Sequence, residues 1–219
     1  ERRNMKQYDS IIEAVGIIKD EELVHSPGSS FLYTTYGYNI LGVLVEKISG
    51  LAFESYLQEN IFKPAGMNTT GIERLENLPD NLSPLYHRNS KGKVKQEVRT
   101  NLSDRIPGGG LYSTAGDMLK FGSALLEGRL ISPSTFELMQ TDSGLNGEGN
   151  PYGIGLFIYG QRPDFGQVLG HGGGQLGVSS QLFLLPEINS VTFVASNTSG
   201  VGKDISHLGV LYFQLANDL

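Results

Sequence analysis

The order of the sequence patterns along this chain most strongly constrains its fold. Apolar residues at helical spacing come first, and strand-like runs come later. Apolar residues recur at helical spacing from Ile40 to Ile48, which predicts a helix ending at Ser49-Gly50. An amphipathic stretch from Phe53 to Phe62 predicts a second helix that stops before Pro64. Beyond a loose loop at 141–151, four short β-branched or aromatic runs are separated by turn residues: 152–159, 168–171, 178–185 and 191–196. A last helical pattern covers 204–215.

This order predicts an α+β fold, with an antiparallel sheet flanked by helices and a mostly helical region beside it. We expect the helical region at residues 1–140 and the sheet meander with its closing helix at residues 141–219. Three local signals refine the expectation. Thr114-x-x-Asp117 is a capping box that opens a helix, and Ser132-Pro133 opens another. Lys91-Gly92-Lys93 predicts a turn between two short strands.

The composition excludes several classes of function. The 219 residues include 23 acidic and 17 basic side chains, a net charge of −6, which argues against a nucleic-acid partner. Without cysteine there is no disulfide, zinc-thiolate or thiol chemistry, and the four histidines show no metal-ligand spacing. We therefore expect no metal or organic cofactor. No apolar run is long enough to predict a membrane span, and the lack of cysteine is compatible with a periplasmic or secreted location.

The densest glycine cluster runs from Gly170 to Gly177 and contains a formal G-x-G-x-x-G match. A dinucleotide site is rejected, because a strand and not a helix follows, and no acidic residue lies about 20 positions on. Two interpretations remain open. The glycines could form a hairpin turn, or they could leave a sheet edge bare so that a ligand lies along its backbone. In the second interpretation His171 lies where a ligand would bind.

Two further segments carry candidate chemistry. Three tyrosines lie within six residues at 33–38, just before the predicted helix, and their simplest interpretation is a packed aromatic cluster. Ser90-x-x-Lys93 is the chain's only S-x-x-K sequence. It lies in a polar turn that contains glycine, whereas S-x-x-K enzymes place serine and lysine one helical turn apart. We exclude Ser90 as a nucleophile, and the chain has no G-x-S-x-G elbow either.

Taken together, four segments resemble the serine β-lactamase-like superfamily of class C β-lactamases, D-Ala-D-Ala peptidases and related esterases. Residues 26–42 are similar to its P-G-x-x-F-x-Y-S-N-x-G-Y-x-L-L-G segment, and residues 64–70 to P-L-G-M-x-x-T. Residues 109–117 follow G-G-L-x-S-T-A-x-D, and residues 171–173 follow the third catalytic motif. The likeness begins near residue 23 and reaches the C-terminus. It implies a β-lactamase/transpeptidase-like fold.

The resemblance also implies roles for individual residues. Tyr33 would relay the proton of a serine nucleophile, the N–H of Gly174 would help to hold the oxyanion, and His171 stands where most members have lysine. Since an unperturbed histidine titrates near ~6.5, we expect His171 to be partly charged at neutral pH and activity to change across pH 6 to 7. Substrate would be bound by Thr35, Gly172 and Gly173. Thr35 replaces the family's asparagine, and with His171 it makes the chain most similar to the mitochondrial serine β-lactamase-like branch and to some esterases.

The family's S-x-x-K nucleophile should lie well before Tyr33, and only 32 residues precede that tyrosine here. We therefore expect this chain to be the C-terminal part of the fold, with the nucleophile on an N-terminal segment of the same protein or on a separate chain. The leading hypothesis is a serine hydrolase acting on amide or ester bonds of small peptide-like substrates, with a peptidase or esterase favoured over a true β-lactamase. The alternative is a non-catalytic binding or scaffold module that keeps the fold.

Overall fold

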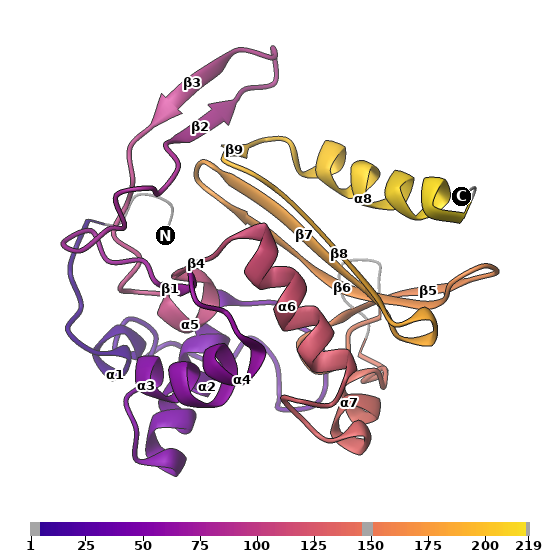
Figure 1. Cartoon of the computed structure of the whole chain (residues 1–219). Helices are drawn as coiled ribbons and strands as arrows, with labels where there is room; N and C mark the ends of the chain where they lie inside the picture. The colour runs from indigo at the N-terminus through magenta and orange to yellow at the C-terminus, as the bar shows by residue number, and fades with distance from the viewer. Residues whose placement is uncertain (1–4, 146–150, 218–219) are drawn as a thin grey trace.

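A four-stranded antiparallel sheet with helices on both faces organises the C-terminal half of the protein (Figure 1). The computed structural model describes residues 5–145 and 151–217. The strands lie in the order β5-β6-β7-β8: Phe157–Arg162, Gly166–Gln175, Val178–Leu185 and Ser190–Ser196. Helices α6 (Ala115–Leu126) and α7 (Pro133–Met139) lie on one face, and α8 (Gly202–Asn217) lies on the other. The predicted α+β fold with an antiparallel sheet is confirmed.

The sheet is apolar on both faces because both are covered. Alternate residues of a strand point to opposite sides, so Leu182 and Leu184 pack in the core beneath α6 and α7, whereas Phe183 packs on the side of α8. Small residues allow the helices to approach closely. A Cβ on Gly122 of α6 would lie 2.5 Å from Val191, and one on Gly209 of α8 would lie 2.5 Å from Phe183.

The strand predictions were right in number and order, with one shift. Residues 152–159 were expected to form a strand, but β5 begins only at Phe157, and Tyr152 makes a single bridge to that residue. The short 3₁₀ helix η2, Pro186–Ile188, connects β7 to β8.

The N-terminal half of the chain contains mostly helices, of which α2 is the longest. They are α1 (Ile11–Val15), α2 (Thr35–Ser49), α3 (Phe53–Leu57), the π-helix η1 (Gln58–Phe62), α4 (Lys63–Ala65) and α5 (Ile106–Gly109). The predicted end of α2 is confirmed, with Gly50 in the left-handed conformation. The prediction that the next helix stops before Pro64 was wrong. The chain continues through a π-helical turn into α4, where proline is tolerated in the first helical turn, and ends at Gly66.

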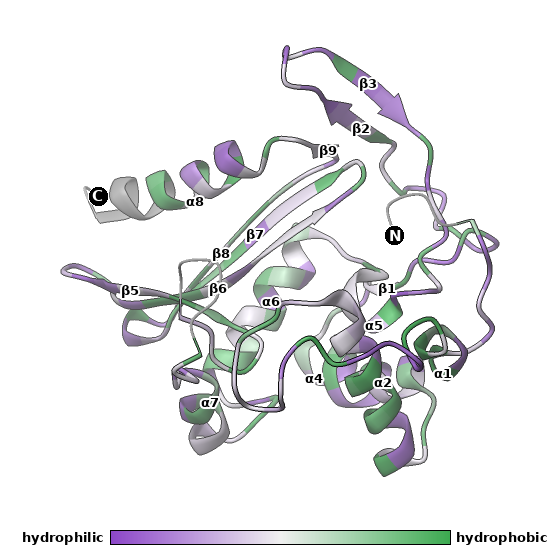
Figure 2. Ribbon diagram, turned by 180° about the vertical axis from the view of Figure 1, so that it is seen from behind, coloured by the Kyte–Doolittle hydropathy of each residue, from purple (hydrophilic) through white to green (hydrophobic). Residues whose placement is uncertain are grey.

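Helix α2 turns its small and polar side inward. Asn39 and Gly42 are buried, and a Cβ on Gly42 would lie 2.4 Å from Pro107 of α5. Hydrophobic residues colour much of the α2 ribbon in Figure 2, and the apolar stripe of this helix is exposed. The side chains of this stripe are between 44% and 85% exposed: Ile40, Leu41, Leu44 and Ile48. We call these four residues the α2 stripe.

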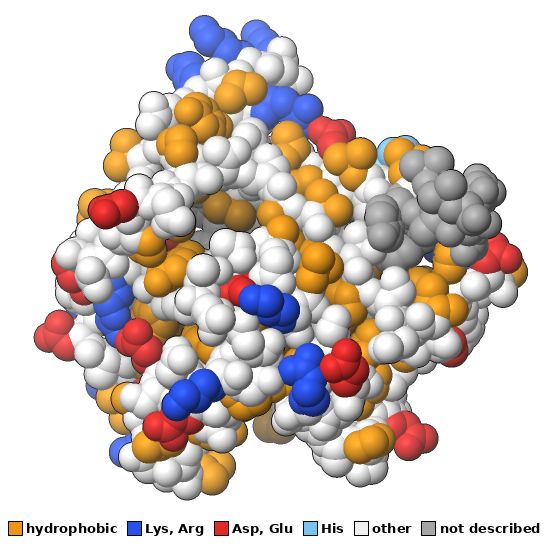
Figure 3. Space-filling model, in the orientation of Figure 1, with side chains coloured by type: hydrophobic (Ala, Val, Ile, Leu, Met, Phe, Trp, Pro, Cys, Tyr) orange, Lys and Arg blue, Asp and Glu red, His pale blue; other side chains and the backbone are white. Residues whose placement is uncertain are grey.

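A hairpin projects from the body of the protein, formed by β2 (Leu85–Arg88) and β3 (Val94–Glu97). Strand β9 (Thr198–Ser199) pairs with β2 in parallel, and β1 (Gly71–Ile72) pairs with β4 (Leu111–Tyr112) elsewhere. The predicted turn at Gly92 is confirmed, and basic side chains gather around it (Figure 3). Ser90 and Lys93 flank this exposed turn and share no helix, in agreement with the exclusion of Ser90 as nucleophile.

Asp117 joins two of the motif segments into one polar network. The predicted capping box is confirmed, since the side chain of Thr114 accepts a hydrogen bond from the backbone of Asp117. The Asp117 carboxylate in turn accepts from the backbone N–H of Thr69 at 2.7 Å and from Lys120 Nζ at 3.0 Å. Hydroxyls of Thr69 and Thr70 donate to the same carboxylate at 2.8 and 3.0 Å. We call these five residues the Asp117 clamp.

Burial opposes the charged form of Asp117, but the hydrogen bonds of the clamp outweigh it. They lower the pKa of this carboxyl from 3.8 to about 2. The clamp ties the turn before β1 to the start of α6.

Across the described ranges, none of the helices combines the length and apolar character needed to cross a bilayer.

Candidate active site

The glycine-rich segment forms the end of a strand, and only its last residues turn. Strand β6 extends to Gln175, and the reversal follows at Leu176-Gly177, where Gly177 has φ +80°. Strand β7 pairs with β6 along residues 169–175, whereas the pairing with β5 ends at Gly170. From His171 to Gln175, therefore, one edge of β6 has no strand beside it within the described chain. Of the two open interpretations, the structure agrees with the bare sheet edge.

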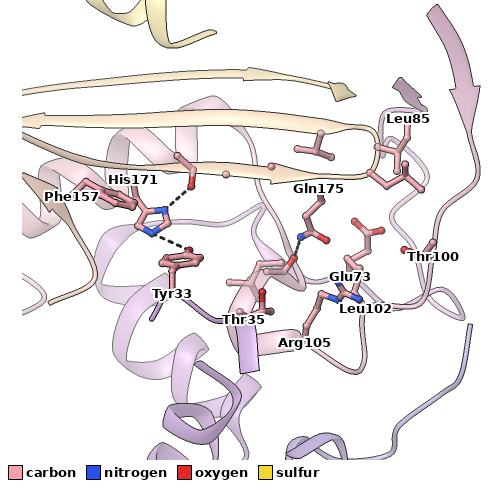
Figure 4. Close-up of a pocket in the computed structure, with 18 of the residues that line it drawn as sticks. Tyr33, Thr35, Glu73, Leu85, Thr100, Leu102, Arg105, Phe157, His171 and Gln175 are labelled. Atoms are coloured by element: carbon pink, nitrogen blue, oxygen red, sulfur yellow. Dashed lines mark hydrogen bonds between the residues drawn. The ribbon is translucent and has the colours of Figure 1, made fainter. Parts of the chain in front are cut away.

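Tyr33 and His171 meet at the start of this free edge (Figure 4). Tyr33 lies just before α2, where Thr34 is extended as the N-cap, and this places its hydroxyl 3.3 Å from His171 Nε2. The side chain of His171 lies on the same face of β6 as Leu169. Helices α6 and α7 cover this face of the sheet. The structure thus brings together two predicted catalytic residues that are 138 positions apart in the sequence.

The hydrogen bonds of His171 define which ring nitrogen carries the proton. Its Nδ1 lies 2.6 Å from the carbonyl oxygen of Gly172, which only accepts, so Nδ1–H is the donor. In the neutral ring, Nε2 is then the acceptor that faces the Tyr33 hydroxyl. Burial lowers the pKa of His171 below its usual 6.5, although the bond to Gly172 opposes this effect. The lowered pKa makes the neutral imidazole more favoured at pH 7 than the usual value of 6.5 would suggest.

Tyr152 is a site residue that the sequence did not indicate. Its hydroxyl lies 3.4 Å from His171 Nε2 and 2.7 Å from the hydroxyl of Tyr38. Desolvation raises the pKa of Tyr152 strongly, with a further contribution from Tyr38, so its hydroxyl stays protonated. Phe157 completes the cluster, with its ring centroid 5.3 Å from that of His171. Of the three tyrosines expected to pack as an aromatic cluster, Tyr33 packs against Tyr152 and Phe157 at the site, and Tyr38 reaches it through its bond to Tyr152.

A cleft of about 680 Å³ follows the free edge, large enough for a small organic ligand. It is lined by all the predicted site residues: Tyr33, Thr35, His171, Gly172, Gly173 and Gly174. Thr35 opens α2 and packs against α5, where a Cβ on Gly108 would lie 2.6 Å from its methyl group. Gly174 is exposed, and a Cβ there would have no neighbour within 4 Å. Among the described residues no cluster of three His, Asp or Glu is placed to hold a metal ion.

A second, apolar cavity of about 330 Å³ lies on the other side of the same glycines; such a volume is comparable to a small ligand site. Its lining includes Met118 and Phe121 of α6, Met139 of α7, and Leu182 and Phe193 of the sheet. His171, Gly172 and Gly173 border both spaces, so the two cavities meet at the candidate site.

Comparison with known sequences identifies the class to which this fold and site belong. Residues 2–215 match the Beta-lactamase family, and the chain belongs to that family. It is 31% identical over 208 residues to the human serine beta-lactamase-like protein LACTB, mitochondrial, covering 83% of this chain and 38% of that protein. It is 30% identical over 168 residues to penicillin-binding protein 4* of Bacillus subtilis, covering 71% of this chain and 37% of that protein. The chain therefore spans less than two fifths of the length of these relatives.

Solved structures show the same fold. A penicillin binding protein from Bacillus halodurans superposes with a TM-score of 0.79 at 25% identity, over 94% of this chain and 63% of that one. A D-stereospecific amidohydrolase from Streptomyces superposes with a TM-score of 0.77 at 24% identity, over 92% of this chain and 62% of that one. The predicted penicillin-recognising fold is thus confirmed.

Proposed function

We propose that this chain supplies the Tyr33–His171 half of a serine hydrolase that acts on amide or ester bonds of small peptide-like substrates. The observation that carries the proposal is the 3.3 Å contact between the Tyr33 hydroxyl and His171 Nε2 at the free edge of β6. A hydroxyl that donates to a neutral imidazole is partly prepared to lose its proton, which a proton relay requires. The family membership and the amidohydrolase neighbour support hydrolysis in general.

In the proposed reaction, a serine oxygen attacks the substrate carbonyl carbon while Tyr33 accepts the serine proton and passes its own hydroxyl proton to His171 Nε2. The N–H of Gly174 would hold the oxyanion, together with the N–H of the serine itself. Collapse of the tetrahedral intermediate breaks the carbon–nitrogen or carbon–oxygen bond, and Tyr33 donates its proton to the leaving group while His171 returns a proton to Tyr33. Water then hydrolyses the acyl-serine by the same route. Thr35, Gly172 and Gly173 would position the substrate.

The nucleophile would come from an S-x-x-K segment N-terminal to this chain, in the same protein or as a separate chain. Two surfaces support this part of the proposal. The apolar cavity borders His171, Gly172 and Gly173, and the α2 stripe offers exposed apolar side chains. Both suit an apolar segment that buries its own side chains against them. A peptidase or esterase is favoured over a β-lactamase, because Thr35 and His171 replace the family's asparagine and lysine.

A serine-directed phosphonate tests the proposal. The complete gene product is incubated with the reagent, and intact-mass spectrometry with peptide mapping locates the adduct. We expect a single adduct on a serine of an S-x-x-K sequence N-terminal to residue 1. An adduct on Ser90 would overturn the assignment of the nucleophile. A protein that gains no adduct would instead be the non-catalytic binding or scaffold module.

A further inference from the structure

The cleft is crossed by hydrogen bonds at two places. At one end Tyr33 meets His171, and further along β6 the side-chain amide of Gln175 donates to the carbonyl oxygen of Gly109 in α5 (Figure 4). We call the second contact the Gln175 bridge. Gly109 makes room for it, since a Cβ at that position would lie 2.7 Å from Gln175 Nε2.

The Gln175 bridge crosses this single cleft between two groups of lining residues, which we call its two compartments. Tyr33, His171 and Phe157 surround the first, whereas the labelled side chains beyond Gln175 belong to the second (Figure 4). This distal compartment is lined by Glu73, Leu85, Thr100 and Leu102. Four residue steps separate His171 from Gln175 along β6. At about 3.3 Å per residue, the two crossing points are roughly 13 Å apart.

The proposed reaction gives the substrate a direction along this edge. The leaving group receives its proton from Tyr33 and therefore lies at the end of the edge near His171. The carbonyl oxygen lies at the N–H of Gly174, so the acyl part of the substrate extends from Gly174 toward Gln175. An extended peptide residue spans about 3.3 Å, so an acyl group longer than about one residue meets the bridge.

We propose that Gln175 is a specificity-determining residue that restricts the enzyme to substrates with a short acyl part. This inference rests on the proposed hydrolase function and names the substrate class of the same site. With the bridge closed, the acyl group ends before the distal compartment. With the bridge open, a longer peptide reaches Leu85, Thr100 and Leu102 and gains contacts there.

The test compares two achiral thioesters that share one thiol leaving group, acetyl-glycyl and acetyl-triglycyl. The complete gene product is assayed for kcat/KM on both. We expect the wild type to prefer the short thioester at least tenfold and Gln175→Ala to bring the ratio close to one. Gln175→Glu keeps the side-chain length but removes the donor at neutral pH, so we expect the same loss of preference. Gln161→Ala, an equal truncation at an exposed position of β5, should keep the wild-type ratio.

The outcomes separate the two proposals. Turnover of both thioesters with no preference in the wild type overturns the role of Gln175, as does a ratio that neither Gln175 variant changes. Both results leave the hydrolase function standing. Failure of the wild type to hydrolyse either thioester counts against the hydrolase function itself. Thermal melting of each variant confirms that a changed ratio comes from a folded protein.

Discussion

The Asp117 clamp and the Tyr33–His171 site are both polar clusters built from motif segments, yet they have opposite electrostatic designs. In the clamp, a buried carboxylate keeps its charge because backbone, hydroxyl and ammonium donors surround it. At the site, a half-buried imidazole favours its neutral form, because burial lowers the pKa of His171 and its neighbours are aromatic. The acceptor capacity of Asp117 is consumed inside the protein, whereas His171 Nε2 and the Tyr33 hydroxyl border an open cleft.

This difference separates the two kinds of motif. The segments 64–70 and 109–117 meet at Asp117 and hold the helical region together. The segments around Tyr33 and His171 meet at the cleft and supply groups that can exchange a proton. Similarity to a family motif therefore does not by itself mark a catalytic residue. Variants of Tyr33, Asp117 and His171 test this difference. From the largest expected effect to the smallest, they should change kcat, the stability of the fold and the pH dependence of kcat/KM.

Tyr33→Phe should have the largest effect. It keeps the ring contacts but removes the hydroxyl that faces His171, so we expect kcat of the complete gene product to fall by about 10³-fold, within the range known for loss of a general acid–base group. Thermal melting should change little, since Tyr33 is 40% exposed. Tyr56→Phe in α3, outside the cleft, is the matched control and should retain activity. A Tyr33→Phe enzyme with wild-type kcat would remove Tyr33 from the proton relay.

Asp117→Asn should act on stability and leave the chemistry intact. The folded pKa of about 2 is lower than the usual 3.8, so the stabilisation is present above pH 3.8 and is lost as the pH falls through 2. We expect a loss of about 2–3 kcal/mol at neutral pH, the range for hydrogen bonds to a buried charge. Thermal unfolding of the complete gene product measures the loss, and kcat per folded molecule should remain unchanged.

The matched control for the clamp is Asp20→Asn, which makes the same change at a carboxylate whose side chain is 86% exposed. Its melting temperature should equal that of the wild type. If both variants melt alike, the clamp contributes nothing measurable to stability, and the pairing of the two motifs must have another cause.

Much of the fold was predictable from local patterns. The end of α2 at Gly50, the capping box at Thr114 and the antiparallel strands depend on signals within a few residues, and all are confirmed. The features that local patterns did not predict correctly are those that tertiary contacts determine. Pro64 was expected to end a helix, but a π turn before it allows the chain to continue. The free edge of β6 depends on where the pairing with β5 stops, which no local pattern encodes.

The site was predicted only as far as the family resemblance reached. Tyr33 and His171 occupy motif positions, so their meeting could be anticipated across 138 residues. Tyr152 lies in no motif, and the isolated bridge to Phe157 that holds it is a tertiary feature. The lowered pKa of His171 was not predicted for a related reason, because its burial comes from neighbours that lie far away in the sequence.

The charge state of His171 leads to the smallest of the expected effects and the sharpest test of the neutral site. If Nε2 must accept from Tyr33, protonation of the ring blocks the relay, so kcat/KM should fall on acidification with its midpoint below pH 6.5. His171→Lys replaces the imidazole by an amine that stays protonated below its usual pKa near ~10.4, so the variant should show no acid limb and keep the low kcat/KM of the protonated wild type. Profiles of kcat/KM from pH 4 to 9 measure the difference, and His25→Gln, at an exposed histidine, should keep the wild-type profile. An unchanged acid limb in His171→Lys would assign that titration to another group and remove His171 from the relay.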